Sequence, residues 1–297
     1  AAISGHHSNR NGDPVEGNFM KPSGKEAYIA DYPLTWWINQ FQLPLHIYSA
    51  PAIRRNVRAF KQVFKTLYPK GHIRFAAKAC AHPVIFKIVI REGAGIDVAS
   101  YYETQCALES GAPPEQLDLN GNCKEDFLIA KAIQTDMVIV ADSIEEFQVV
   151  SGIAKRMGKR PRVVMRISGF ELGHVTAEAI FTAGRWTKFG ASLEDIPDFL
   201  NTLDRHPHIQ LLGFHTHIGS QIADLEPYLA VLGKMIELGH LLKETGRDCM
   251  IINIGGGFPI SYVSSQEWNR FMERIKEGYL ASQKGDPSRI FIWHNRT

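Results

Sequence analysis

The sequence predicts an α/β fold of the closed (β/α)8, TIM-type barrel class. Short apolar runs alternate with segments of helical periodicity from about residue 43 onward, and the pattern repeats about every 20 to 25 residues. Strands that alternate with helices pair in parallel, and this many units on one chain favour a barrel over an open doubly wound sheet. A chain of 297 residues, 44% of them hydrophobic and 22% charged, can bury the core that a barrel needs.

The expected elements follow one another in regular order. A strand over 43–49 precedes a helix over 50–68, whose apolar side chains Ile53, Val57, Phe60 and Phe64 recur at helical spacing. The further strands are expected at 72–78, 95–100, 117–121, 137–142, 162–168, 211–219 and 249–257, with helices at 82–93, 101–111, 124–134, 143–158, 193–204 and 227–246.

The first 26 residues form a separate segment in this interpretation. They are rich in Gly, Asn, Ser and Pro and offer little apolar surface to bury, so residues 1–26 are expected to be flexible. They also contain no apolar core of the kind that a signal peptide carries. The barrel domain is therefore assigned to residues 27–297.

Composition narrows the classes of partner. The net charge is +2 and no long basic run occurs, so neither nucleic acid nor a membrane is an expected partner, and a small-molecule substrate is. No apolar run reaches the roughly 18 residues of a membrane span. The four cysteines lie far apart without a CxxC pair, which favours reduced thiols, no metal site and a cytoplasmic location.

Polar residues end most of the predicted strands. Because catalytic groups of such barrels lie at the carboxyl ends of the strands, these side chains are expected to converge on one mouth. They are Lys78, Asp97, Asn120, Asn122, Asp142, Arg166, His215, His217 and Gly255 to Gly257. Structural roles remain open for several of them: Asp142 as a helix cap, Asn120 and Asn122 as turn formers, and Asp97 with Arg166 as an ion pair.

Lys78 stands out in the stretch "IRFAAKACAHP", residues 73–83. Lysine is rarely buried without a partner, because its ammonium loses hydration there. At the end of an apolar run, between small residues, a partly desolvated amine is expected to serve as a nucleophile.

A glycine-rich stretch, "NIGGGFP" at 253–259, indicates a phosphate site. Three consecutive glycines after a strand let backbone amides approach an anion closely, although such a run can also be only a flexible turn. The stretch "HIGSQ" at 217–221 adds the hydroxyl of Ser220. A lysine, a carboxylate, a histidine and a phosphate nest together suggest pyridoxal 5'-phosphate (PLP) as cofactor.

The same motifs, in this order, resemble the fold type III PLP-dependent decarboxylases, the relatives of diaminopimelate, ornithine and arginine decarboxylases. The matching stretches are "FAAKACAHPVI", "GIDVAS", "TKFG", "GFHTHIGSQ" and "NIGGGFPISY". The resemblance covers roughly residues 40–262, and "HTHIGSQ" and "NGNCKE" place it nearest the diaminopimelate branch. It implies an alanine racemase-like barrel.

The resemblance also implies roles for individual residues. Lys78 would carry the cofactor as a Schiff base and His217 would stack on its ring. Ser220, Gly255, Gly256 and Gly257 would hold the phosphate. Ala76, Asp97 and Arg166 would lie close around the cofactor. The implied activity is decarboxylation of a diamino or basic amino acid such as meso-diaminopimelate, by a homodimer.

The sequence departs from this family near its end. The family's Glu-Pro-Gly-Arg segment and its C-terminal β-domain have no counterpart, and Trp293 stands near where the carboxylate would be expected. The chain is therefore interpreted as incomplete at its C-terminal end, able to bind PLP but expected to lack turnover by itself. Two alternatives stay open: a non-catalytic PLP-binding or regulatory pseudo-enzyme, and a metal-dependent hydrolase using His215 and His217.

Overall fold

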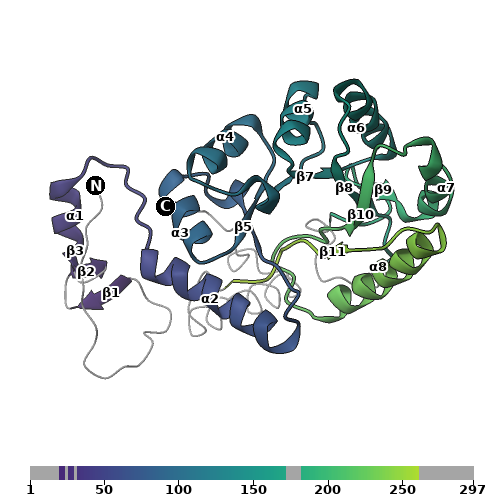
Figure 1. The fold of residues 1–297 in the computed structure, drawn as a ribbon. Coiled ribbons are helices and arrows are strands. Elements are labelled where there is room, and N and C mark those ends of the chain that lie inside the picture. The colour runs from purple at the N-terminus through teal and green to yellow at the C-terminus, as the bar shows by residue number, and fades with distance from the viewer. Residues whose placement is uncertain (1–19, 24–25, 30–31, 172–181, 261–297) are drawn as a thin grey trace, which may run out of the picture. The chain divides into compact units, whose positions relative to one another are not determined.

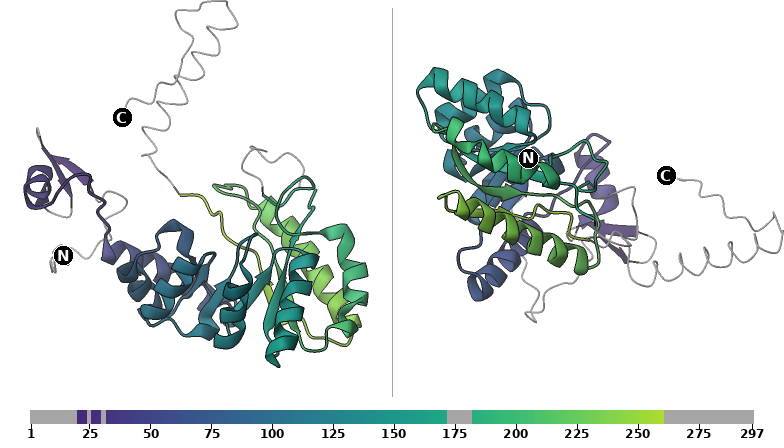
Figure 2. Two further views of the ribbon diagram at one scale, coloured as in Figure 1. Left: turned by 90° about the horizontal axis from the view of Figure 1, so that it is seen from above. Right: turned by 90° about the vertical axis from the view of Figure 1, so that its right-hand side faces the viewer.

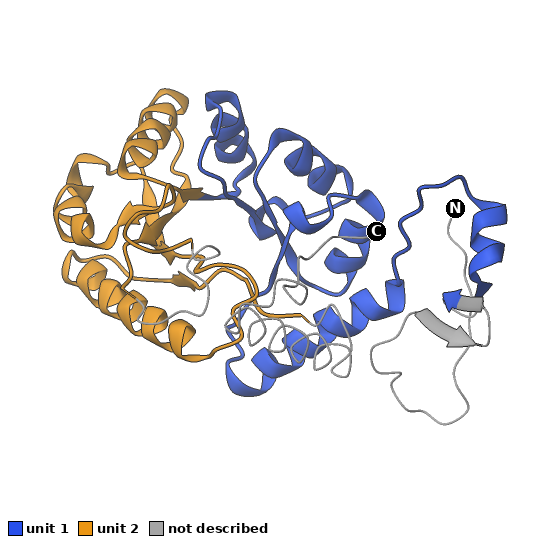
Figure 3. Cartoon of the chain, turned by 180° about the vertical axis from the view of Figure 1, so that it is seen from behind, with its two compact units in different colours: residues 1–139 blue, residues 140–297 orange. Residues whose placement is uncertain are grey.

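The computed structural model describes residues 20–23, 26–29, 32–171 and 182–260. The chain divides into two compact units, residues 1–139 and residues 140–297, which Figure 3 shows in different colours. The division falls within strand β7 (Val138–Ala141), and each unit is built from its own parallel strands and helices.

Unit 1 contains parallel strands in chain order. They are β4 (Arg74–Ala76), β5 (Gly95–Val98), β6 (Leu117–Leu119) and the start of β7. The helices of this part are α2 (Ala50–Leu67), α3 (Pro83–Arg91), α4 (Tyr101–Glu109) and α5 (Asp126–Thr135). The register pairs Ala76 with Asp97 and Asp97 with Asp118, so one row of residues crosses three strands.

The core of unit 1 explains why α2 forms where periodicity predicts it. Ile53 and Val57 of α2 pack against the buried side chains Ile85, Val89 and Ala94. The helix begins at a side-chain cap, since the Ser49 hydroxyl accepts a hydrogen bond from the Ala52 amide at 3.3 Å. Apolar side chains on one stripe thus attach the helix to the sheet.

Unit 2 contains the end of β7 and three further strands of the sheet. They are β8 (Arg162–Ser168), β10 (Gln210–His215) and β11 (Ile251–Asn253), with a short β9 (Ala191–Ser192) pairing with β8. Its helices are α6 (Ile144–Met157), α7 (Ile196–Asn201) and α8 (Glu226–Glu244). In Figures 1 and 2 these helices lie along the outer side of the strands. Phe147, Met165, Phe214 and Met235 are fully buried.

Two strands pass directly into helices through the same capping arrangement. After β5, the Ser100 hydroxyl accepts from the Glu103 amide, and the Glu103 carboxylate accepts from the Ala99 amide. After β7, Ser143 and Glu146 repeat this reciprocal pair. Such a capping box satisfies helix N-terminal amides within a short connection, which fixes where each strand end lies.

A small antiparallel sheet precedes the first parallel strand. It consists of β1 (Met20–Ser23), β2 (Glu26–Ile29) and β3 (Tyr32–Pro33), followed by α1 (Leu34–Gln40). Tyr32 stacks on Trp36 with ring centroids 4.3 Å apart, and Trp37 and Phe41 complete the aromatic cluster. The sequence interpretation did not predict these elements.

Most of the predicted parallel strands and helices are confirmed, which confirms the α/β class. The strand expected at 43–49 is wrong, because that segment is irregular and leads into α2. The helix expected at 193–204 is broken into α7 between two short 3-10 turns. Residues 1–19 and 261–297 lie outside the described residues, so the flexible segment 1–26, the domain limits 27–297 and the assignment at Trp293 stay predictions.

Candidate active site

The carboxyl ends of the unit 2 strands bring several predicted residues side by side. Arg166 of β8 pairs in register with His215 of β10, and His215 pairs in register with Asn253 of β11. His217 follows β10 by two residues and the three glycines follow β11. The parallel register therefore places these groups on one edge of the unit, as the strand-end rule predicts.

Arg166 is held rigidly by a buried ion pair. Its Nη1 donates to Asp142 Oδ1 at 2.8 Å, and both side chains are less than a tenth exposed. The guanidinium also lies over the Phe189 ring, 4.4 Å from its centroid. Asp142 accepts a further bond from the Gly190 amide at 3.3 Å. Two alternatives left open by the sequence are thus wrong: Arg166 pairs with Asp142 rather than Asp97, and the helix cap is Ser143, not Asp142.

In the loop after β11, two of the three glycines are required by the backbone, and the third is not. Gly255 and Gly257 have φ of +71° and +90°. A Cβ on Gly255 would lie 2.5 Å from the Thr216 carbonyl oxygen, and one on Gly257 would collide with the Gly219 carbonyl oxygen. Neither position tolerates another residue without strain. Gly256 differs, because in the described part of the chain no atom beyond its own neighbours lies within 4 Å of the Cβ position there.

Hydrogen bonds attach this loop to the residues around it. The Gly255 amide donates to Asn253 Oδ1 at 2.9 Å, and the Gly256 amide donates to His217 Nδ1 at 3.3 Å. The Thr182 hydroxyl donates to the His217 carbonyl oxygen at 2.7 Å. His217 is half-buried, and Ser220 is exposed next to the Gly219 backbone that packs on Gly257.

Unit 1 gathers the other predicted residues at its own strand ends. Ala76 ends β4 beside Asp97 of β5, and Lys78 lies two residues further on, in a 3-10 turn over Ala77–Ala79. The Lys78 side chain is exposed. The sequence-based expectation of a partly desolvated amine is therefore wrong for this structure.

Asp97 is the titratable group with the most altered environment near Lys78. Burial and the charge of Asp118 raise the pKa of the Asp97 carboxyl to about 7, whereas the Asn120 amide and the Lys78 ammonium act to lower it. The Asn120 Nδ2 donates to Asp97 Oδ2 at 3.2 Å. Asp118 is itself paired with Arg74 at 3.1 Å. Desolvation therefore keeps a proton available at neutral pH on this carboxyl.

The predicted site residues thus form two groups. Ala76, Lys78 and Asp97 belong to unit 1, and Arg166, His217, Ser220 and Gly255 to Gly257 belong to unit 2. Sequence reasoning missed Thr182, for which no motif gives a signal, and it treated Asn120 mainly as a turn former. Asn120 makes a turn contact, accepting from the Gly121 amide, and also bonds Asp97.

The hypothesis of a metal-dependent hydrolase required His215 and His217 on one strand face. Strand β10 ends at His215, which is buried, and His217 lies beyond the strand. Within the described ranges, no group of three or more His, Cys, Asp or Glu side chains is arranged to hold a metal ion. In the same part of the chain no helix is long and apolar enough to span a bilayer.

Comparisons with known proteins agree with the geometry. Residues 51–285 match the family described as "Pyridoxal-dependent decarboxylase, pyridoxal binding domain". The diaminopimelate decarboxylase of Aquifex aeolicus is 29% identical over 238 residues, which are 80% of this chain and 56% of that protein. That of Staphylococcus aureus is 31% identical over 230 residues, 76% of this chain and 53% of that protein.

A solved structure extends the likeness to the fold. The diaminopimelate decarboxylase from M. jannaschii in co-complex with L-lysine has a TM-score of 0.76 and 26% identity, covering 83% of this chain and 58% of that chain. The predicted resemblance and barrel class are confirmed. The chain spans little more than half the length of the Aquifex and Staphylococcus relatives.

Proposed function

Because the chain belongs to the pyridoxal-dependent decarboxylases, matched through their pyridoxal-binding domain, we propose that it binds PLP and decarboxylates a diamino acid. The observation that carries this proposal is the open space at Gly256. Backbone conformation and close contacts explain the glycines on either side, but no contact among the described residues explains the middle one. A ligand that needs the space of a side chain would account for it.

The residues of unit 2 fit the phosphate and ring of this cofactor. The loop of Gly255 to Gly257 leaves room at Gly256, and the exposed Ser220 hydroxyl can donate to an anion placed there. His217, fixed at its carbonyl by Thr182 and at Nδ1 by the Gly256 amide, would lie against the ring. Arg166 and Asp142 remain paired with each other in a buried position beside this group of residues.

The residues of unit 1 supply the amine and a proton. Lys78 is the proposed covalent attachment point, and its exposure leaves the Nζ accessible to the cofactor. Asp97, with its pKa near 7, can hold or release a proton at its carboxyl oxygen next to that amine. When bound, PLP supplies the electron sink that stabilises the carbanion left by loss of carbon dioxide.

A diamino acid is the proposed substrate class, with meso-diaminopimelate as the first candidate. The curated relatives named above are diaminopimelate decarboxylases, and one solved relative was crystallised with L-lysine. A homodimer in the cytoplasm is the proposed working state. The widely spaced cysteines support that location.

Two measurements on the protein test this proposal. Absorbance should show PLP bound to the purified protein, and carbon dioxide release should be compared for meso-diaminopimelate, lysine, ornithine and arginine. We expect release to be fastest from meso-diaminopimelate. PLP binding with no release from any of the four would match the expectation that this chain lacks turnover by itself and would leave only the PLP-binding part of the proposal standing. Absence of PLP binding would overturn the whole proposal.

A further inference from the structure

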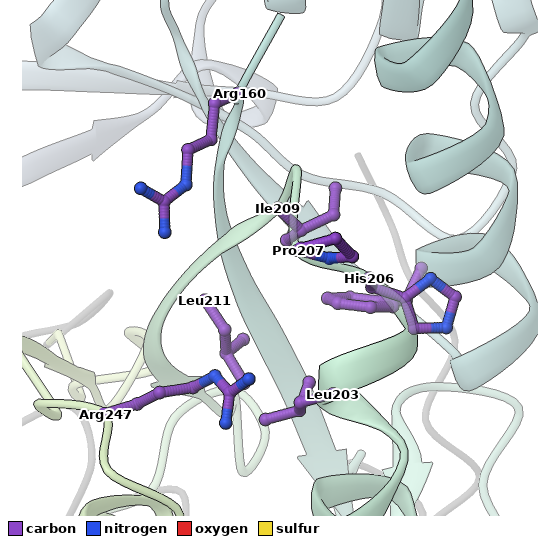
Figure 4. Close-up of a pocket in the computed structure, with 8 residues that line it drawn as sticks. Arg160, Leu203, His206, Pro207, Ile209, Leu211 and Arg247 are labelled. Carbon is purple, nitrogen blue, oxygen red and sulfur yellow. The ribbon is translucent and has the colours of Figure 1, made fainter.

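A small pocket lies in unit 2 at the end of the strands opposite the candidate active site. Its volume is about 190 Å³. Phe147, Leu203, Pro207, Ile209 and Leu211 give it apolar walls, and Arg160, His206 and Arg247 complete the lining (Figure 4). This volume lies below the roughly 300–1,000 Å³ of sites for drug-sized ligands, so the pocket suits only a small molecule and not a nucleotide.

The charged side chains that line the pocket are all basic. Arg160 precedes β8 and Arg247 precedes β11, and Figure 4 shows their guanidinium groups extending toward the same space. Arg160 is exposed, and among the described residues it has no hydrogen bond or ion pair. Arg247 donates from Nη1 to the Thr245 carbonyl oxygen at 3.1 Å and from Nη2 to Asp204 at 2.7 Å. The Asp204 side chain is 91% exposed, so water screens the ion pair.

The floor of the pocket is held in place by buried contacts. The His206 ring packs edge-on against the Phe147 ring at 5.4 Å between centroids, and its Nδ1 lies 2.7 Å from the Ser151 hydroxyl. Ser151 and Phe147 are both buried on α6. Burial first, and then the charges of His208 and Arg205, lower the pKa of His206.

The position of the pocket separates it from the proposed chemistry. Strand β8 begins at Arg162 and reaches Arg166 and Ser168 at its other end. At about 3.3 Å per residue, a seven-residue strand separates its two ends by about 20 Å. A molecule bound between Arg160 and Arg247 therefore cannot touch the glycine loop or His217.

We propose that this pocket binds a small organic carboxylate with an apolar body. Planar guanidinium groups bind carboxylates through paired, charge-assisted hydrogen bonds, and two of them face one space here. Among the apolar lining side chains Pro207 is exposed and would contact the hydrocarbon part, whereas the others are buried, so the guanidinium groups supply most of the affinity. The site is independent of the PLP site and of the proposed activity.

The test uses benzoate as the probe and PLP-loaded protein, so that the cofactor site is filled. NMR titration should follow the ring signals of His206, assigned with a His206→Gln variant, in the wild type and in Arg160→Gln and Arg247→Gln variants. Arg156→Gln is the matched control, because Arg156 is exposed on α6 and does not line the pocket. Benzamide serves as the neutral analogue and inorganic phosphate as the anion without an apolar body.

We expect benzoate to shift the His206 signals and its affinity to fall roughly tenfold or more in either pocket variant, as loss of a charge-assisted bond implies. The Arg156→Gln variant should bind like the wild type. Unchanged affinity in both pocket variants, no shift at His206, or equal binding of benzamide would overturn the proposal. A response to phosphate as strong as that to benzoate would mean a general anion patch and would also overturn the proposed ligand class.

Discussion

At the scale of single residues, the group with an altered environment is Asp97, whereas the sequence-based interpretation expected Lys78. That interpretation placed the perturbed group at Lys78, through burial of its amine. In the structure Lys78 is exposed, and the carboxyl of Asp97 has its pKa raised to about 7 by burial and by Asp118. The carboxyl of Asp97 can therefore exchange a proton near neutral pH.

The altered Asp97 has a consequence for stability. Its pKa is raised from 3.8 to about 7, so between these values the folded protein holds a proton that the unfolded chain has lost. The contribution of this group to the free energy of unfolding is therefore full below pH 4 and decreases as the pH rises to 7. Urea unfolding of cofactor-free protein at pH 5 and pH 8 should show a larger loss in the wild type than in an Asp97→Asn variant. Glu115→Gln, at an exposed position, should behave like the wild type. The assignment would be contradicted if the Asp97→Asn variant lost as much free energy of unfolding between pH 5 and pH 8 as the wild type.

The buried pair of Arg166 and Asp142 should be costly to break. Removing one partner leaves an uncompensated charge in a buried place, so Asp142→Ala should lower the free energy of unfolding by about 3–5 kcal/mol. Arg185→Gln removes an exposed pair with Glu194 and should cost less than about 1 kcal/mol. Chemical unfolding of both variants measures this, and equal small losses would show that the Arg166 pair is not held as described.

Residue-scale prediction succeeded where position along a strand decides the outcome. Lys78, Asp97, Arg166 and His217 all lie at or just after strand ends, as expected. It failed for Asp142, since adjacent Asp and Ser residues are both good caps and only backbone geometry selects Ser143. It failed for the exposure of Lys78, because burial depends on neighbours that a local apolar run does not reveal.

At the scale of elements, the loop after β11 is the part whose sequence is most tightly explained. Gly257→Ala should destabilise the protein by about 1–3 kcal/mol, because a side chain there meets the Gly219 carbonyl and a φ of +90°. Gly256→Ala should leave the stability of the cofactor-free protein unchanged or raise it by up to about 1 kcal/mol, since the Cβ meets nothing.

The same Gly256→Ala variant should bind PLP more weakly, by roughly tenfold or about 1.4 kcal/mol, because the added methyl occupies space proposed for the phosphate. Thermal unfolding and equilibrium PLP titration measure the two effects separately. A variant that retains full PLP affinity would show that the open space does not receive the phosphate.

Elements with a single strong signal were predicted well. Helix α2 follows from its apolar stripe, and the helices after β5 and β7 begin at Ser-x-x-Glu capping boxes. The strand expected at 43–49 was wrong. The run is short, and Pro44 has no backbone N–H to donate to a neighbouring strand. The helix expected at 193–204 is correct in place but is α-helical only over Ile196–Asn201, because the chain tightens into 3-10 turns at Leu193–Asp195 and Leu203–Arg205.

At the scale of the whole molecule, the predicted site residues fall into two groups, one in each unit. The amine and the carboxyl come from unit 1, and the phosphate loop and histidine come from unit 2. The sequence did not predict this division into two units, because strand-end convergence and family resemblance name the side chains but not the contacts that hold them. His217→Ala should therefore slow carbon dioxide release far more than it weakens PLP binding, since the glycine loop and Lys78 are proposed to hold PLP without it. Equal loss of both would assign His217 to binding instead.

The most direct test of the central claim is borohydride reduction of the PLP-loaded protein followed by peptide mapping. Reduction makes the link between the cofactor and a lysine amine permanent, so the labelled peptide identifies the residue. We predict that the label lies on Lys78, in the turn after β4. A label on Lys124 or Lys188 instead, or no label on any lysine, would contradict it.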